Sequence, residues 1–301
     1  MKKFTLLMAI VVAALNTSAQ SDSTNVADTT RPVIKRDTIR VGNILIIKKG
    51  KKGDADEDGV VAVTMGRKNY QGKSNSKIST NWWVLDLGFA NYDDQTNYAA
   101  TGNYLVNRPG SPALGSSDFK LRTGKSINVN IWIVMQRLSL VKNYVNLKYG
   151  LGVELNNYRY KSPISYSEGG LIPYSGGMQT SSPFIFRDSI NFSKNKLAAD
   201  YLTVPFMINF NSNPNSSKKG ISASFGVSAG YLYSQRNKQD SDERGKRKNK
   251  GEYDLEKFKI SYIGELGLGP VKLYGSYSPK SIYENSLDMR PYTVGLRFSN
   301  W

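Results

Sequence analysis

Seven ionisable side chains lie within stretches where apolar and polar residues alternate, and they carry most of the chemistry that this sequence offers. They are Asp86, Lys148, Glu154, Lys259, Glu265, Lys272 and Arg297. Because successive side chains of a β-strand point to opposite faces, all seven fall on a polar face that is backed by an apolar one. Charges enclosed in a narrow interior must pair, since an unpaired buried charge is costly. We expect one salt-bridge network that includes Lys148 and Glu154 and plugs the interior; the alternative is a path for protons or ions.

An acidic segment suggests calcium binding. Asp54, Asp56 and Asp58 precede Gly59 with the spacing of the opening of a calcium loop, in which the sixth place is glycine. The twelfth place is Met65, where such loops need a bidentate glutamate. We therefore favour a solvated acidic turn and expect no metal site, although calcium binding stays open.

A basic segment, 236–257, offers a second binding chemistry. Its cations are Arg244, Lys246, Arg247, Lys248 and Lys250. They could bind the phosphates of a surface glycolipid. Acidic residues are interspersed among them, which favours a solvated, mobile loop.

Two residue types are missing altogether. The chain has no cysteine and no histidine, so it lacks a thiolate nucleophile, the commonest general base and the commonest transition-metal ligand. A Ser–Lys pair remains formally open, but no spacing singles one out. We expect neither an enzyme nor a cofactor.

The first twenty residues resemble a secretory signal. Lys2 and Lys3 precede an apolar stretch over 4–15, and the small residues Thr17, Ser18 and Ala19 follow as a cleavage site. This predicts a signal peptide over 1–19. The chain has a net charge of +17. Because an exported protein meets the cell envelope and not cytosolic nucleic acid, we expect an anionic membrane surface as the partner of this charge.

The segment 20–80 is polar and interrupted by charges, so we predict a periplasmic lead. Within it, 39–47 reads as one strand and 60–64 as its partner in a small hairpin.

From residue 81 to 301 the sequence alternates with period two, which is typical of strands that have one apolar and one polar face. The predicted strands are 82–90, 127–136, 145–156, 197–210, 221–233, 258–268, 271–277 and 292–298. Long connections alternate with short ones, which places every long connection at one end. We predict an all-β fold, an eight-stranded antiparallel up-and-down transmembrane β-barrel with both termini in the periplasm.

Alternation alone also fits a soluble barrel with its apolar face inward. Three observations favour the membrane: small residues on the polar face, long connections at one end, and aromatic residues near strand ends. The expected aromatic girdle comprises Trp82, Trp83, Tyr92, Tyr158, Tyr160, Tyr231, Tyr233, Phe298 and Trp301.

A family resemblance rests on three stretches, 201–206 (YLTVPF), 267–270 (GLGP) and 292–298 (YTVGLRF). With them, residues from about 80 to 301 resemble the small outer-membrane β-barrels common in Bacteroidota, the PorT-like and OmpX-like group. The resemblance implies an assembly signal for the barrel-assembly machinery at Phe298 and Trp301. Pro205 cannot donate to a sheet ladder, so we expect a bulge there.

These observations predict a non-enzymatic protein of the outer membrane. Its expected role is in envelope structure or surface interaction through its long external loops. The expected partners are outer-membrane lipid and glycolipid, the assembly machinery and other envelope proteins. The alternative is a PorT-like accessory component of protein secretion.

Overall fold

The computed structural model describes residues 38–41, 44–48, 61–65, 77–214, 220–268 and 271–299. The chain divides into two compact units, Met1–Lys73 and Ser74–Trp301. The predicted signal peptide, the acidic residues Asp54, Asp56 and Asp58, and Trp301 lie outside the described residues. Within these ranges, no helix has the length and apolar character that a bilayer crossing requires.

The first unit contains a three-stranded antiparallel sheet with the order β1-β2-β3. Its strands are β1 (Thr38–Val41), β2 (Ile44–Lys48) and β3 (Val61–Met65). The prediction of one strand over 39–47 is therefore wrong, because this stretch forms two strands that pair with each other. The predicted partner at 60–64 corresponds to β3, which pairs with β2.

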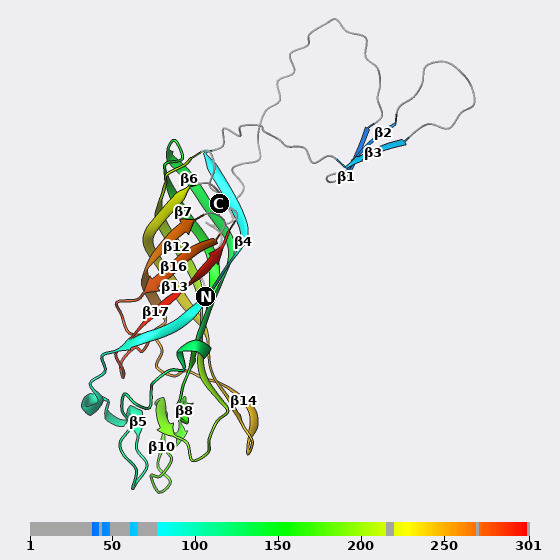
Figure 1. The fold of residues 1–301 in the computed structure, drawn as a ribbon. Helices are drawn as coiled ribbons and strands as arrows, with labels where there is room; N and C mark the ends of the chain where they lie inside the picture. The colour runs from blue at the N-terminus through cyan, green and yellow to red at the C-terminus, as the bar shows by residue number, and fades with distance from the viewer. Residues whose placement is uncertain are drawn as a thin grey trace, which may run out of the picture. The chain divides into compact units, whose positions relative to one another are not determined.

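The second unit contains eight long strands that close into a ring (Figure 1). They are β4 (Ile78–Asp94), β6 (Ile127–Val141), β7 (Val145–Arg159), β12 (Lys194–Asn211), β13 (Ile221–Ser241), β15 (Phe258–Leu268), β16 (Val271–Tyr277) and β17 (Met289–Phe298). Each pairs antiparallel with the next in the chain, and β17 pairs with β4 to close the ring. The predicted eight-stranded antiparallel up-and-down fold is confirmed.

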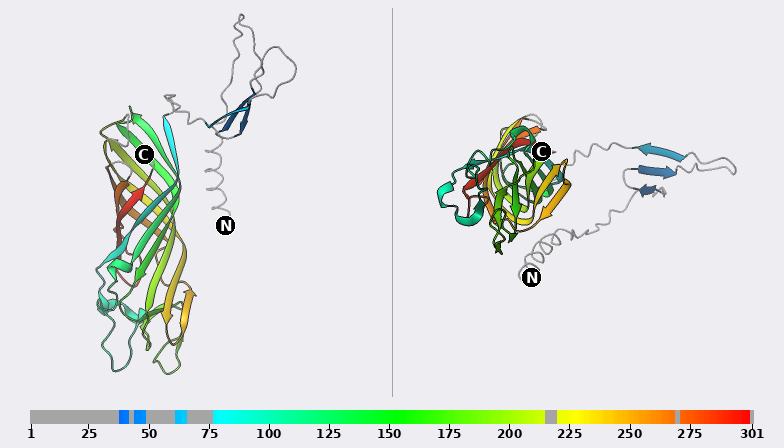
Figure 2. Two further views of the ribbon diagram at one scale, coloured as in Figure 1. Left: turned by 45° about the vertical axis from the view of Figure 1, so that its right-hand side comes forward. Right: turned by 90° about the horizontal axis from the view of Figure 1, so that it is seen from below.

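The connections alternate in length around the ring. Those at 95–126, 160–193, 242–257 and 278–288 are long and gather at one end, here called the loop end (Figures 1 and 2). Those at 142–144, 212–220 and 269–270 are short. Most of the strands are longer than predicted, chiefly because they continue past the apolar stretch into sequence that reads as loop.

The long connections carry structure of their own. They contain η1 (Tyr98–Ala100), η2 (Gly102–Tyr104), β5 (Leu105–Val106), η3 (Thr123–Lys125), β8 (Ile164–Ser167), β9 (Gly170–Leu171), β10 (Gln179–Thr180), β11 (Phe184–Arg187) and β14 (Gly245–Lys250). Strand β11 lies between β5 and β8 in a small sheet. Strand β14 pairs with the end of β13, so the expected mobile loop at 236–257 is mostly a β-hairpin.

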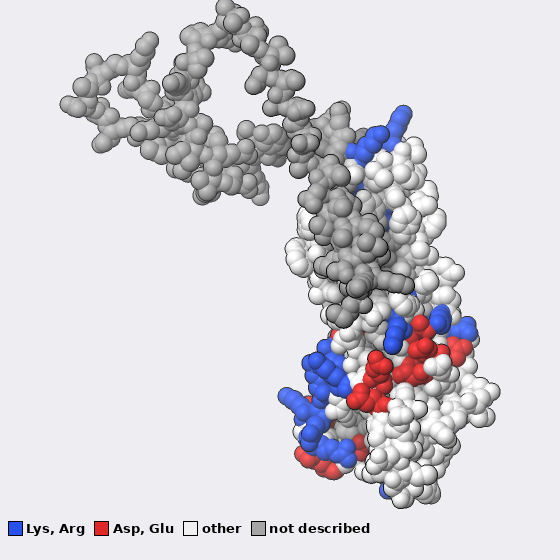
Figure 3. All heavy atoms as spheres, turned by 180° about the vertical axis from the view of Figure 1, so that it is seen from behind, with Lys and Arg blue, Asp and Glu red and all other residues white. Residues whose placement is uncertain are grey.

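The outer wall of the ring is apolar. Phe206, Phe225, Ile260 and Leu273 are among the outward side chains and remain about half exposed. On the visible face, the wall between the two ends carries few charged residues (Figure 3). An apolar band around a closed ring is what a bilayer requires of spanning strands.

A bulge changes the predicted faces of one strand. The register between β6 and β7 shifts at Ile133, between Trp132 and Val134. Strict alternation along 127–136 would turn Met135 outward together with Ile133, but the bulge turns Met135 inward, opposite Gly150, where it is buried. Pro205 behaves differently from the prediction, because no register shift occurs there. The β12–β7 pairs are only interrupted between Thr203 and Phe206, with the same register on both sides.

The loop end contains a second core, inside and beyond the ring. Its buried members include Tyr104, Phe119, Tyr158, Tyr160, Ile164, Tyr166, Tyr253, Leu255 and Tyr283. The hydroxyl of Tyr166 lies 2.6 Å from that of Tyr160 and 2.7 Å from that of Tyr283. Seen from below, the connections lie across the end of the ring (Figure 2).

This core corrects part of the expected aromatic girdle. Tyr158 and Tyr160 are buried within it, and Tyr92 packs against it. Trp82, Trp83, Tyr231, Tyr233 and Phe298 do face outward and are exposed. Alternation in the sequence could not distinguish the buried tyrosines from the exposed aromatic residues, because it does not show that strands β7 and β4 continue beyond the apolar band.

Candidate functional site

All seven predicted interior charges point into the ring, and each residue is at most 7% exposed. They come from five strands. Strands β7 and β15 contribute two each, and β4, β16 and β17 contribute one each. Four are cations and three are carboxylates, so the group carries one net positive charge. Such a set is stable in a low-dielectric interior only when its members pair closely.

Glu265 is the centre of the larger cluster. Its Oε1 accepts from Lys148 Nζ at 2.7 Å and lies 3.1 Å from Lys272 Nζ. Its Oε2 accepts from Arg297 Nη1 at 2.8 Å. One buried carboxylate therefore meets three cations.

Arg297 joins this centre to Asp86. Its Nε and Nη2 donate to the two carboxylate oxygens of Asp86, both at 2.7 Å. This bidentate geometry is the strongest form of an arginine–carboxylate contact. Asp86 also accepts from Trp132 Nε1 at 2.7 Å and from Asn130 Nδ2 at 3.1 Å.

The second cluster is the ion pair of Glu154 with Lys259. The Lys259 ammonium lies 4.6 Å from the centroid of the Tyr201 ring, a cation–π distance. Lys148 and Glu154, expected in one network, lie in different ion-pair clusters, because Lys148 pairs with Glu265 and Glu154 pairs with Lys259.

A series of asparagines links the two clusters. Asn156 donates to Glu154 at 2.9 Å, Asn128 donates to Asn156 at 2.8 Å and to Asn130 at 3.0 Å, and Asn130 reaches Asp86. These asparagines are buried. They were not among the predicted members of the network. They alternate with apolar residues in 127–136 and 145–156, on the same face as the charges, and this pattern was the signal that could have found them.

One small cavity lies beside this network. A cavity of about 20 Å³ is lined by residues that include Trp132, Glu154, Met207, Tyr274 and Arg297. This volume is close to that of a single water-sized probe. Chemically, the arrangement is a set of buried, mutually paired charges and amides in the interior of the ring.

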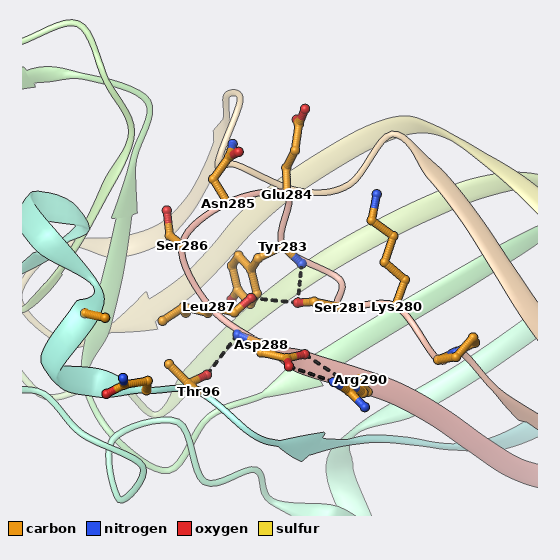
Figure 4. A pocket seen from close by; sticks show the side chains of 13 residues that line it. Thr96, Lys280, Ser281, Tyr283, Glu284, Asn285, Ser286, Leu287, Asp288 and Arg290 are labelled. Atoms are coloured by element: carbon orange, nitrogen blue, oxygen red, sulfur yellow. Dashed lines mark hydrogen bonds and ion pairs between the residues drawn. The ribbon is translucent and has the colours of Figure 1, made fainter.

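A cleft of about 450 Å³ opens at the loop end between 96–100 and 279–290 (Figure 4). Asp288 pairs with Arg290 at 2.9 Å, and Thr96 Oγ1 accepts from the Asp288 amide at 3.0 Å. Ser281 donates to the Leu287 carbonyl at 2.7 Å. Lys280 and Glu284 point away from these contacts. Most of these polar groups therefore bond to one another and stabilise the loop.

The other predicted candidates lie as follows. Phe298 ends β17 on the outer wall and is 43% exposed. Arg244 Nη1 pairs with Asp188 at 2.9 Å, within the loop end. Within the described ranges, no three acidic side chains gather closely enough to hold a metal ion.

Comparison with known families identifies the class of this fold. Residues 74–279 match the family described as outer membrane protein beta-barrel domain. The match covers more than half of the chain, so the protein belongs to this family and is an outer-membrane β-barrel protein. The matched region ends before β17, although β17 closes the ring. No curated protein matches the chain.

Proposed function

We propose that this protein is a closed, non-enzymatic outer-membrane barrel that serves envelope structure or surface interaction through its loop end. The observation that carries the proposal is the buried contact of Glu265 with Lys148, Lys272 and Arg297 in the interior of the ring. An eight-stranded barrel has an interior that side chains can fill, and the buried, paired charges in this one support a filled interior. The absence of histidine and cysteine from the sequence supports a role without catalysis.

The test is conductance in planar bilayers. We expect no stable open channel from the purified protein, with a porin as the positive control for insertion. Folding is checked by the shift in gel mobility on heating. Large, steady single-channel currents from heat-shifting protein would contradict a plugged interior.

We further propose that the loop end faces the cell exterior and that both termini are periplasmic. Long external loops and short periplasmic turns are the usual arrangement in such barrels. Trypsin added to intact cells should cut the exposed β14 hairpin, which carries Lys246, Arg247 and Lys248. A tag at residue 20 should stay protected. The reverse pattern would invert the orientation.

The alternative function is that of a PorT-like accessory component of protein secretion, and its binding partners would distinguish it from the first proposal. An accessory component should co-purify with secretion proteins from native membranes, and its deletion should block secretion. A structural or surface role predicts intact secretion with altered envelope integrity.

A further inference from the structure

Four basic residues from four neighbouring strands form a straight row on the outer surface. Arg159 of β7 is the Cα partner of Lys196 in β12, which is the partner of Lys238 in β13, which is the partner of Lys248 in β14. We call these four residues the basic row. Residues directly opposite each other in antiparallel strands have Cβ atoms about 5 Å apart, and like charges there are destabilising.

Further cations flank the basic row on the same face. Arg236 is the partner of Lys250, and Asp240 is the partner of both Lys194 and Lys246. Together with the row, these cations form the basic patch, which comprises Arg159, Lys194, Lys196, Arg236, Lys238, Lys246, Lys248 and Lys250. In the view from behind, Lys and Arg gather along the side of the molecule where β14 lies (Figure 3).

Carboxylates compensate little of this charge. Arg236 pairs with Asp200. Among the residues that the structure describes, no carboxylate lies within 4.0 Å of the ammonium of Lys196, Lys238 or Lys248. The Nε of Arg159 is buried without a hydrogen-bond partner.

Partial burial and this crowding both lower lysine pKa values in the patch. Lys196 lies beyond the apolar outer residues of β12, which run from Leu202 to Phe210. Partial burial, followed by repulsion from Lys238 and other patch cations, lowers the pKa of Lys196 to about 8. Partial burial, followed by repulsion from Arg236, Lys248 and Lys194, lowers the pKa of Lys238. An anion on the row would relieve this repulsion.

The distance of the basic patch from the membrane interface, measured along the barrel axis, indicates which kind of anion it can bind. Tyr231 and Tyr233 face outward where β13 leaves the apolar band, a position typical of the membrane interface. At about 3.3 Å per residue and a tilt of about 40°, Arg236 lies about 8 Å and Asp240 about 18 Å beyond Tyr233 along the barrel axis. A phospholipid headgroup layer is only about 5–8 Å thick. The patch therefore extends beyond a simple phospholipid headgroup.

We propose that the basic patch binds the phosphate groups of a phosphorylated glycolipid in the leaflet at the loop end. Such a lipid carries its acyl chains beside the apolar wall and its phosphates within a thick sugar headgroup, at the height of the cations. Lysine and arginine bind phosphate through charge-assisted hydrogen bonds. The proposal rests on the orientation proposed above, but binding in detergent can be measured whatever the orientation.

The experiment measures lipid binding to the full chain in detergent by native mass spectrometry. The probes are a bisphosphorylated acylated disaccharide, its dephosphorylated form, phosphatidylglycerol and free pyrophosphate. The first variant, K196Q/K238Q/K248Q, removes three charges of the row. The second, K246Q/K248Q/K250Q, changes only β14, which lies outside the ring and should not affect its folding. The matched control, K120Q/K125Q/K161Q, removes three exposed charges elsewhere at the loop end.

We expect the bisphosphorylated glycolipid to bind most tightly. At about fivefold per lysine near a charged surface, the first variant should bind it roughly 100-fold more weakly, the second should also weaken it, and the control should change it less than threefold. Equal binding of the dephosphorylated lipid would overturn the proposal. So would displacement by equimolar pyrophosphate, which indicates a free-phosphate site, or an equal loss in the control, which indicates nonspecific attraction.

Discussion

Replacing Glu265 by glutamine is the sharpest test of the interior network. The carboxylate side chain is 1% exposed and contacts Lys148, Lys272 and Arg297. Glutamine keeps the shape but removes the charge, so the seven interior charges change from one net positive charge to two. Breaking a buried ion pair by removing one partner costs about 3–5 kcal/mol. We expect E265Q to lower the free energy of unfolding by an amount in this range.

The assay is urea unfolding from lipid vesicles, followed by tryptophan fluorescence. The double variant E265Q/K148M should recover about 0.5–3 kcal/mol, because the unpaired cation is removed with its partner. The pair E154Q and K148M should be nearly additive, since Glu154 pairs with Lys259 whereas Lys148 pairs with Glu265. E284Q, at an exposed loop carboxylate, is the matched control and should be silent.

The reasoning is refuted by one combination of results. If E265Q unfolds like the wild type and shows no coupling to K148M, the interior charges are hydrated by bulk water. The interior would then be open, and the proposed plug would fail with it.

Three further predictions follow from particular contacts. Gly295→Ala should lower the free energy of unfolding by roughly 1–3 kcal/mol in the same assay, because a Cβ there would meet the Leu87 carbonyl oxygen and the Gly88 Cα well inside contact distance. The control Gly264→Ala, whose Cβ would have its nearest neighbour 4.0 Å away, should be nearly neutral. Equal effects of the two variants would contradict the packing. Tyr166→Phe removes the hydroxyl between Tyr160 and Tyr283 and should destabilise the loop end by about 1–2 kcal/mol. We expect faster proteolysis of the loop end, with Tyr144→Phe as the exposed control. Unchanged proteolysis would argue against the tyrosine contacts. Glycolipid binding should weaken as the pH rises through about 8, because Lys196, whose lowered pKa is about 8, loses its positive charge there. The variant K196Q should make binding less dependent on pH in this range. If the pH dependence of binding is the same in K196Q, Lys196 is not part of the site.

The fold was predictable because alternation is a local property of the chain. In β7, the residues from Val145 to Asn156 alternate without interruption, and the structure turns Lys148 and Glu154 inward as expected. The same reasoning failed at Met135, because a bulge at Ile133 reverses the faces beyond it. It also failed at 39–47, where Gly42 and Asn43 interrupt the apolar residues and the stretch forms two paired strands.

The loop end was not predictable, because its core forms between segments distant in sequence. Tyr158 and Tyr160 alternate with polar residues just as a girdle would, but they pack against residues from three other connections. The basic row was hidden for the same reason. Its four members are spread from residue 159 to residue 248, and only strand register brings them into line.

By itself, the sequence determined the class of protein, the number of strands in the ring and which charged residues face its interior. These follow from period-two patterning and from the requirement that a spanning sheet be apolar outside. Only the tertiary structure decided which charges pair. Arg297 meets Asp86 across 211 residues of chain, and the tilt and stagger of closed strands set that contact. No local pattern encodes it, because Arg297 and Asp86 are opposite residues of β17 and β4, the strand pair that closes the ring, and register and closure rather than spacing along the chain make them partners.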